Sequence, residues 1–175
     1  MRAAAVIAAV IAIATATAAV AGPARAESAA LTPQAHADLG LSVVGLGYER
    51  PFADHVAVQA QGGIFGTYFL PWFDRGDDVQ GLQLGARVTW FARASGRGLY
   101  VAPYVRGVAV RGERDGQSGQ GLGFTAGAFV GWAIGLGERV DLRLGAGAQW
   151  IYVDADPLAA STPFLAADIL LGYRL

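Results

Sequence analysis

The chain has 175 residues, of which 54% are apolar and 15% are charged, and it contains no cysteine. This length fits one domain, the apolar fraction is high for an ordinary soluble protein, and disulfides contribute nothing to its stability. All 13 basic residues are arginine and face 14 acidic residues, which excludes a strongly basic surface of the kind that binds nucleic acid.

The N-terminal segment has the pattern of an export signal. Arg2 precedes an apolar run over 3–21, and Ala-Arg-Ala at 24–26 supplies a small-residue cleavage site. Residues 1–26 are therefore predicted to be a cleaved signal peptide, and residues 27–175 the mature domain, with 11 arginines against 14 acidic residues and a net charge of −3. The alternative is a retained membrane helix, since the run approaches the roughly 20 residues that span a bilayer.

Most of the mature chain alternates apolar and small or polar residues with a period of two, which indicates β-strands. In the clearest segment, 81–91, the outward face carries Leu82, Leu84, Ala86, Val88 and Trp90. Alternation of this length exceeds the five or six residues usual for a strand and matches a strand that crosses a membrane. Because every backbone group in lipid must be paired, the strands are expected to close into a barrel. The same pattern, with no outward charge, recurs over 56–70, 99–109, 122–134, 140–152 and 165–175.

The connectors divide into two kinds. Short turns are expected at 51–54, 92–98 and 137–139, and longer polar loops at 71–80, 112–120 and 154–162. In outer-membrane barrels the short turns are periplasmic and the longer loops are outside. This orientation predicts two aromatic belts, because aromatics favour the two membrane interfaces. One belt contains Trp90, Trp132 and Tyr173, and the other contains Tyr68, Phe124, Trp150 and Tyr152.

The strand count is expected to be eight. A strand over about 39–49 brings the total to seven, and bacterial single-chain barrels have even numbers of strands. The eighth is therefore assigned to 27–38, although Pro33 and a poor apolar pattern weaken that segment. Pro103 is expected to mark a bulge, because proline cannot donate to the strand ladder.

Three motifs carry a family resemblance: Gly-Tyr-Glu-Arg at 47–50, Leu-Tyr-Val-Ala-Pro-Tyr at 99–104 and Leu-Gly-Tyr-Arg-Leu at 171–175. From about Gly45 onward the chain resembles the small bacterial outer-membrane β-barrels of the OmpA/OmpX type and related uncharacterised outer membrane protein beta-barrel domains. The resemblance implies an all-β, eight-stranded antiparallel transmembrane barrel in the outer membrane of a Gram-negative cell. It also implies insertion by the barrel-assembly machinery and contact with outer-membrane lipid and lipopolysaccharide.

The inward face of the predicted barrel is unusually polar. Eight strands enclose a lumen just wide enough for side chains to fill, and buried charges need partners of opposite sign. We therefore predict a plug of ion pairs, with a narrow polar path or a small-ligand cavity as the alternative. Glycines 123, 127 and 131 would leave room for Tyr100, Tyr104 and the arginines opposite. The inward polar set is Glu49, Gln59, Gln61, Gln83, Arg87, Arg106, Asp141, Arg143, Gln149, Asp168 and Arg174.

Catalysis is not expected. A serine nucleophile needs a histidine base, and the mature chain has only His36 and His55, neither within three residues of a serine. The Gly-x-Gly sequences at 121–123 and 145–147 fall inside strands, so they are not nucleotide-binding turns.

No metal or cofactor site is predicted either. Loop carboxylates could share a divalent ion with lipopolysaccharide phosphates, but solvation alone explains them more simply. These carboxylates are Asp74, Asp77, Asp78, Asp154 and Asp156.

The sequence thus predicts a non-enzymatic integral outer-membrane protein with a structural, envelope or surface-contact role. A small channel, a ligand-binding barrel and a soluble secreted lipocalin-like barrel are the alternatives, and no specific ligand is indicated.

Overall fold

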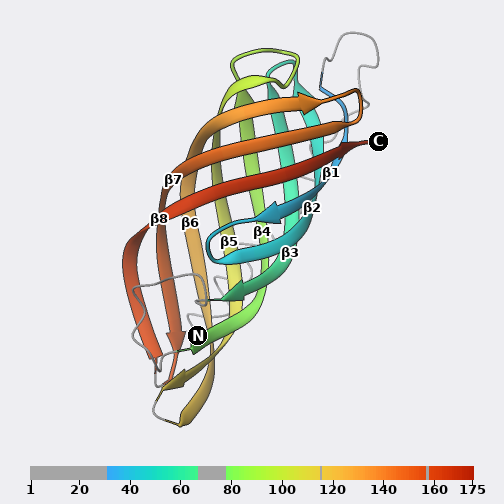
Figure 1. Ribbon diagram of the computed structural model, residues 1–175. Coiled ribbons are helices and arrows are strands. Elements are labelled where there is room, and N and C mark those ends of the chain that lie inside the picture. Colours follow the sequence, from blue (N-terminus) through green and yellow to red (C-terminus); the bar gives the residue numbers. More distant parts are fainter. Residues whose placement is uncertain (1–30, 67–77, 115, 157) are drawn as a thin grey trace.

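The structure, a computed structural model, describes residues 31–66, 78–114, 116–156 and 158–175 (Figure 1). The predicted signal peptide, Tyr68, Asp74 and Asp77 lie outside these ranges. Within them, no helix is long and apolar enough to cross a membrane. Eight strands form in the described residues: β1 (Gln34–Leu39), β2 (Val43–Ala53), β3 (Val56–Gly66), β4 (Asp78–Phe91), β5 (Gly98–Arg114), β6 (Gln117–Leu136), β7 (Val140–Ala155) and β8 (Leu158–Arg174).

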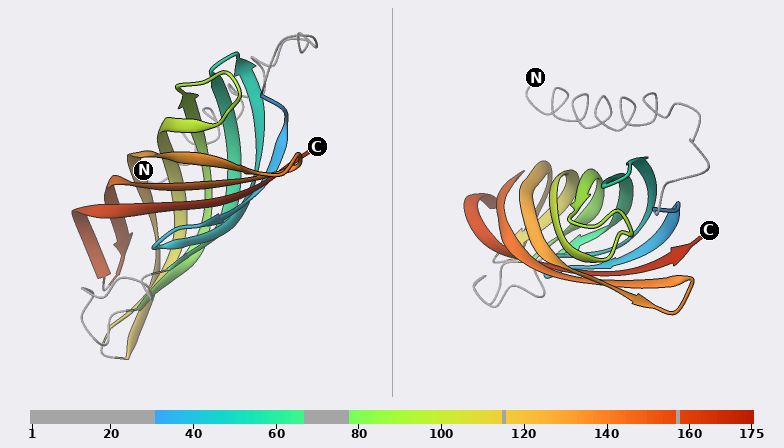
Figure 2. Two further views of the ribbon diagram at one scale, coloured as in Figure 1. Left: turned by 45° about the horizontal axis from the view of Figure 1, so that its top comes forward. Right: turned by 90° about the horizontal axis from the view of Figure 1, so that it is seen from above.

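The strands pair antiparallel in chain order and close into one barrel, with β1 beside β8 (Figure 2). If one starts at Gln34 and steps from each residue to its partner on the next strand, from β2 round to β7, one reaches β8 at Phe164. Gln34 itself, however, pairs with Arg174 of β8. This offset of ten residues, from 164 to 174, is the shear of the barrel, and it forces the strands to tilt against the barrel axis. The predicted eight-stranded closed barrel is confirmed.

The two ends of the barrel differ. One end, which we call the turn rim, carries the connections at 54–55, 92–97 and 137–139 and lies at the top of Figure 1. The opposite end, the hairpin rim, carries the connections of the β5–β6 and β7–β8 pairs. Those four strands reach 16 to 20 residues, so this rim is slanted and extends far beyond β1.

The prediction of long loops at 112–120 and 154–162 is wrong. β5 and β6 stay paired as far as Arg114 and Gln117, and β7 and β8 as far as Ala155 and Leu158. The hydrophobic alternation ends where the exterior ceases to be apolar, but backbone pairing continues without it. Composition therefore marks the end of the apolar band and not the end of the strand.

The N-terminal strand forms as expected, although shorter than the predicted segment. β1 begins directly after Pro33, and its Gln34, His36 and Asp38 point inward while Ala35 and Leu39 are exposed. The expected strand at 39–49 is β2, displaced to Val43–Ala53 because a turn occupies residues 40–42.

The strand irregularity expected at Pro103 is found beside Pro51 instead. Pro103 causes no register shift, so the expected bulge is wrong. It is exposed and pairs in register with Ala128 of β6, and the ladder to β4 is interrupted only at Ala102 and Pro103. The irregularity lies instead between Pro51 and Ala53 of β2, where the predicted turn at 51–54 is replaced by a strand that continues to Ala53.

The exterior is apolar, as the alternation predicts. Leu46, Leu82 and Leu84 are 71%, 70% and 66% exposed. Trp90, Trp132 and Tyr173 lie exposed toward the turn rim, and Trp150 and Tyr152 lie exposed toward the hairpin rim, where Tyr152 stacks on Phe124 with ring centroids 5.5 Å apart. Side chains that a soluble protein would bury therefore form a continuous outer surface.

The seam that closes the barrel is short. β1 pairs with β8 over five residue pairs, from Gln34 with Arg174 to Asp38 with Leu170. The turn after β1 then leads away into β2, while β8 continues to Leu158.

Candidate functional site in the barrel interior

The predicted inward polar residues line the lumen. Ten of them are at most 5% exposed, and only Arg174, at the turn rim, is half-buried. Four ion pairs involve these residues, one of them with Asp38 of β1, and three of the pairs connect strands that are not neighbours. Isolated buried charges are very costly, so their stability depends on this pairing.

The first pair crosses the full lumen. Arg87 on β4 donates from both terminal nitrogens to the carboxylate of Asp168 on β8, and one of these distances is 2.7 Å. Tyr100 on β5 donates its hydroxyl to Asp168 Oδ2 at 2.5 Å. Three strands thus meet at one carboxylate, and the bidentate geometry fixes the guanidinium in a single orientation.

The second pair lies between β2 and β7. Arg143 donates to both oxygens of Glu49 at 2.7 and 2.6 Å, and Nε2 of His36 lies 3.7 Å from Glu49 Oε1. The side chains of all three are at least 99% buried. His36 therefore lies against the Glu49 carboxylate inside the plug.

The third pair joins the opposite strands β1 and β5. Arg106 Nη2 donates to Asp38 Oδ2 at 3.0 Å. In the amide orientation that satisfies its neighbours, Gln61 accepts from Arg106 Nε at 2.5 Å and donates to Asp38 Oδ2 at 3.1 Å. β1 is thereby tied to the far wall of the barrel.

The fourth pair closes the turn rim. Arg174 donates to both oxygens of Asp141, at 2.8 and 2.9 Å, and Gln34 donates to Asp141 Oδ2 at 2.8 Å. Leu31, which is 4% exposed, packs at the same end in a cluster with Phe91 and Tyr100. Leu31 thus covers the lumen at the turn rim.

Aromatic rings fill the space between the charges. The Arg87 guanidinium carbon lies 5.2 Å from the Phe129 ring centre, and that of Arg143 lies 4.8 Å from Phe91, both within cation–π range. Tyr104 stacks on Phe129 with centroids 4.7 Å apart and donates its hydroxyl to Gln149 at 2.8 Å.

Room for Tyr100 depends on glycine, as predicted for position 131. An ideal Cβ built on Gly131 would lie 2.5 Å from the Tyr100 hydroxyl oxygen, and one built on Gly145 would lie 2.6 Å from it. The nearest neighbours of an ideal Cβ at Gly123 and Gly127 belong to β7 instead: the Cβ would meet Val153 at the first position and Gln149 at the second.

Nearer the hairpin rim the lumen is apolar, which the sequence analysis missed. Inward side chains of five strands pack into a second buried cluster with no charge in it. The alternation at Val108 and Val110 continues from Arg106 and could have revealed it, since all three share one face of β5. The cluster contains Val43, Phe65, Val79, Val108, Val110, Ile151, Val153 and Ala155, with Phe164 packed against it.

The structure separates the residues considered for catalysis or metal binding. His55 lies exposed at the turn rim with Nδ1 2.9 Å from the Phe91 carbonyl oxygen, whereas His36 is buried beside Glu49. Asp154 and Asp156 are exposed near the hairpin rim, and the side chain of Asp78 is not among those that the structure describes. Within the described ranges, no group of three His, Asp or Glu side chains is arranged to hold a metal ion.

Comparison with known proteins gives structural similarities only. No protein-family model matches the chain, and no curated protein matches it. It is similar to the crystal structure of Neisserial surface protein A (NspA), with a TM-score of 0.42, 15% identity and coverage of 82% of this chain and 94% of that chain. It is also similar to Ail, the attachment invasion locus protein of Yersinia pestis, with a TM-score of 0.41, 12% identity and coverage of 79% and 98%.

The architecture itself is decisive about the class of fold. A closed antiparallel barrel leaves few unpaired backbone groups, its exterior is apolar between two sets of aromatic side chains, and its lumen is polar. These are the properties of single-chain barrels in the bacterial outer membrane. The chain has the fold of the small bacterial outer-membrane β-barrels.

Proposed function

We propose that the protein is a non-catalytic outer-membrane barrel whose lumen is sealed and whose role is to stabilise the envelope or present the strands of the hairpin rim at the cell surface. The observation that carries this proposal is the set of three ion pairs across the lumen, Arg87–Asp168, Arg143–Glu49 and Arg106–Asp38. They occupy the axis that a conducted solute would have to follow.

Two further features support a sealed interior. The apolar cluster at Phe65, Val110 and Ile151 fills the lumen toward the hairpin rim, and Leu31 covers it at the turn rim. An ion would have to pass an apolar layer as well as the ion pairs, so a small channel is the less favoured function.

The exterior argues against a soluble lipocalin-like binder. Such a barrel has a polar outer surface and an apolar interior. Here Leu46, Leu82 and Leu165 are more than 60% exposed, while Arg87 and Arg143 are each 1% exposed.

The test is reconstitution of the full mature chain into planar bilayers. We expect heat-modifiable migration on gels, which reports a folded barrel, together with no single-channel current. Discrete current steps from the folded protein would refute the sealed lumen, and recovery of the protein as a soluble periplasmic monomer would refute the membrane location.

A further inference from the structure

We infer that the turn rim binds anionic phospholipid headgroups through three exposed arginines, Arg93, Arg97 and Arg139. This inference rests on the proposed membrane location. It adds a binding surface for a phosphodiester of the phosphatidylglycerol class, which the sealed-barrel role does not require.

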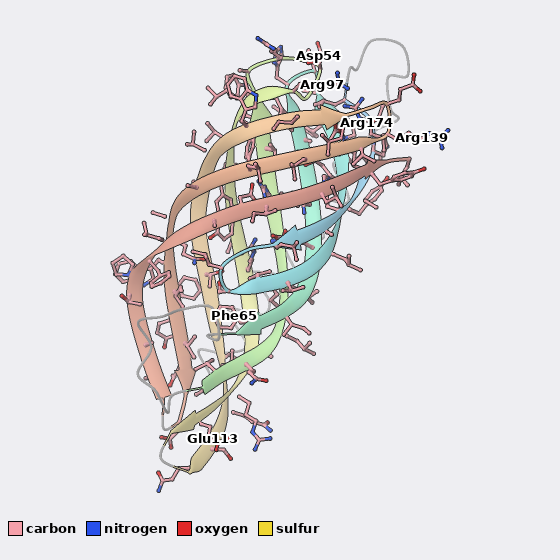
Figure 3. The ribbon with its side chains drawn as sticks, viewed as in Figure 1. Asp54, Phe65, Arg97, Glu113, Arg139 and Arg174 are labelled. Carbon is pink, nitrogen blue, oxygen red and sulfur yellow. The ribbon has the colours of Figure 1, made fainter. Side chains whose placement is uncertain are left out.

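Arg97 and Arg139 lie at the same end of the barrel, on the turns at 92–97 and 137–139 (Figure 3), and Arg93 belongs to the same turn as Arg97. All three side chains are exposed. Arg97 Nη2 donates to the Gly137 carbonyl oxygen at 3.2 Å, which links the two turns directly. An ideal Cβ on Gly135 would lie 2.5 Å from the Arg97 guanidinium carbon, so the absence of a side chain there lets the guanidinium lie against β6.

Two of the arginines lie beside aromatics that mark the membrane interface. Arg139 Nη1 donates to the Tyr173 hydroxyl at 3.3 Å. Arg93 and Trp132 flank Gly98, whose ideal Cβ would lie 3.7 Å from a carbon of each. Because exposed tryptophan and tyrosine side chains settle at headgroup depth, these guanidinium groups are placed at the level of lipid phosphates.

Arginine suits this ligand. Its planar fork donates two parallel hydrogen bonds to a phosphate, and it is more weakly hydrated than lysine. The hydrogen bonds that position Arg97 and Arg139 go to a carbonyl and a phenol, both uncharged, so each guanidinium keeps its charge and further donors for a ligand. The exposed acids of this rim, Asp54 and Glu138, number fewer than the three arginines.

The charge on the opposite end has the other sign. Among the side chains described there, three acidic ones are exposed, those of Glu113, Asp154 and Asp156, and one basic one, that of Arg111. A barrel whose two rims carry exposed charges of opposite sign distinguishes the two faces of a membrane by their charge. In outer-membrane barrels the longer extensions face outward, so the projecting β5–β8 strands assign the hairpin rim to the outside; the turn rim then meets the inner leaflet, which consists of phospholipid.

The test measures lipid selectivity by spin-label electron paramagnetic resonance. The folded full mature chain is reconstituted in vesicles of phosphatidylcholine containing spin-labelled phosphatidylglycerol or spin-labelled phosphatidylcholine. We expect the motionally restricted fraction to favour phosphatidylglycerol about fivefold, which corresponds to about 1 kcal/mol of attraction. This preference should fall as salt is added, because exposed charges are screened.

The R93Q/R97Q/R139Q variant should lose the preference, and the matched R111Q variant at the hairpin rim should keep it. Equal affinity of the wild type for both lipids would overturn the inference, as would a preference that the triple variant retains. Pull-down of purified peptidoglycan by the wild type without any lipid preference would also overturn it and assign the surface to the cell wall. In these cases the proposed function stands, because it fails only if the protein does not insert as a heat-modifiable barrel or if the folded barrel conducts.

Discussion

The carboxylate of Glu49 on β2 and the guanidinium of Arg143 on β7 meet across the lumen through two hydrogen bonds of 2.7 and 2.6 Å. Because β8 and β1 lie between these strands, the pair fixes the distance across the closing seam. We expect Glu49→Gln to destabilise the barrel by about 3–5 kcal/mol, since it leaves the Arg143 charge buried without its partner. Urea unfolding followed by gel mobility measures this.

The double substitution E49L/R143L is the matched comparison for that prediction. Replacing both members of a buried ion pair by apolar residues is often neutral or stabilising. It should therefore recover most of the lost stability, whereas Glu138→Gln on the exposed turn should change little. Equal stability of E49Q and wild type would show that the pair does not hold the two walls together.

The contact between Gly145 and Tyr100 predicts a coupling between two substitutions. A Cβ at position 145 would lie 2.6 Å from the Tyr100 hydroxyl, which donates to Asp168, so Gly145→Ala should displace that hydroxyl and cost about 1–3 kcal/mol. Tyr100→Phe removes the oxygen that clashes. The G145A/Y100F double variant should therefore lose less stability than the sum of the single variants, as measured by a double-mutant cycle. Additive losses would contradict the close approach.

A charge on the apolar exterior should be penalised according to its depth. Leu84 is 66% exposed on β4, six residues from the aromatic Trp90. Leu84→Arg near the middle of the bilayer should destabilise the folded barrel by about 2–4 kcal/mol relative to water-facing positions. Ser118→Arg, close to the hairpin rim, is the control and should cost about 1 kcal/mol or less. Refolding into lipid vesicles at several urea concentrations gives both values, and equal costs would argue against immersion of Leu84 in lipid.

The seam between β1 and β8 depends on Asp38, the last β1 residue that pairs with β8. Asp38→Asn weakens the tie to Arg106 on the far wall, which holds β1 in place through a 3.0 Å hydrogen bond. Amide hydrogen exchange over 34–38 should become faster than in wild type, while exchange over the long β5–β6 ladder should not change. Unchanged protection of 34–38 would show that the backbone ladder alone holds the seam.

Much of this fold was predictable from the sequence because one physical constraint repeats along it. Lipid outside and a cramped lumen inside impose a period of two, so the faces of Leu84, Arg87 and Trp90 could be assigned without a structure. The pairing of particular charges could not, because it depends on the shear. Only the closed register shows that Arg106 reaches Asp38 on β1 rather than another carboxylate.

Other features were harder to predict from the sequence, each for its own reason. The apolar cluster around Phe65 and Val110 was missed because inward positions were expected to be small or polar throughout. β1 was the weakest strand in the pattern because of Pro33 and its poor apolar alternation, and only the even strand count of such barrels predicted it. Its inward alternation of Gln34, His36 and Asp38 is the signal that could have identified it. The extended hairpins had no hydrophobic signature at all, because backbone pairing beyond the lipid is independent of apolar side chains.

The length of β6 has a consequence for how a ligand would meet the hairpin rim. Its 20 residues span about 66 Å at roughly 3.3 Å per residue, and even a steep tilt leaves them longer than a hydrocarbon layer about 30 Å thick. The projecting portion is a ladder of paired strands, so its conformational entropy is already lost before any encounter. A ligand docking there would meet a preorganised surface, and its affinity would not be reduced by the ordering that a flexible loop demands.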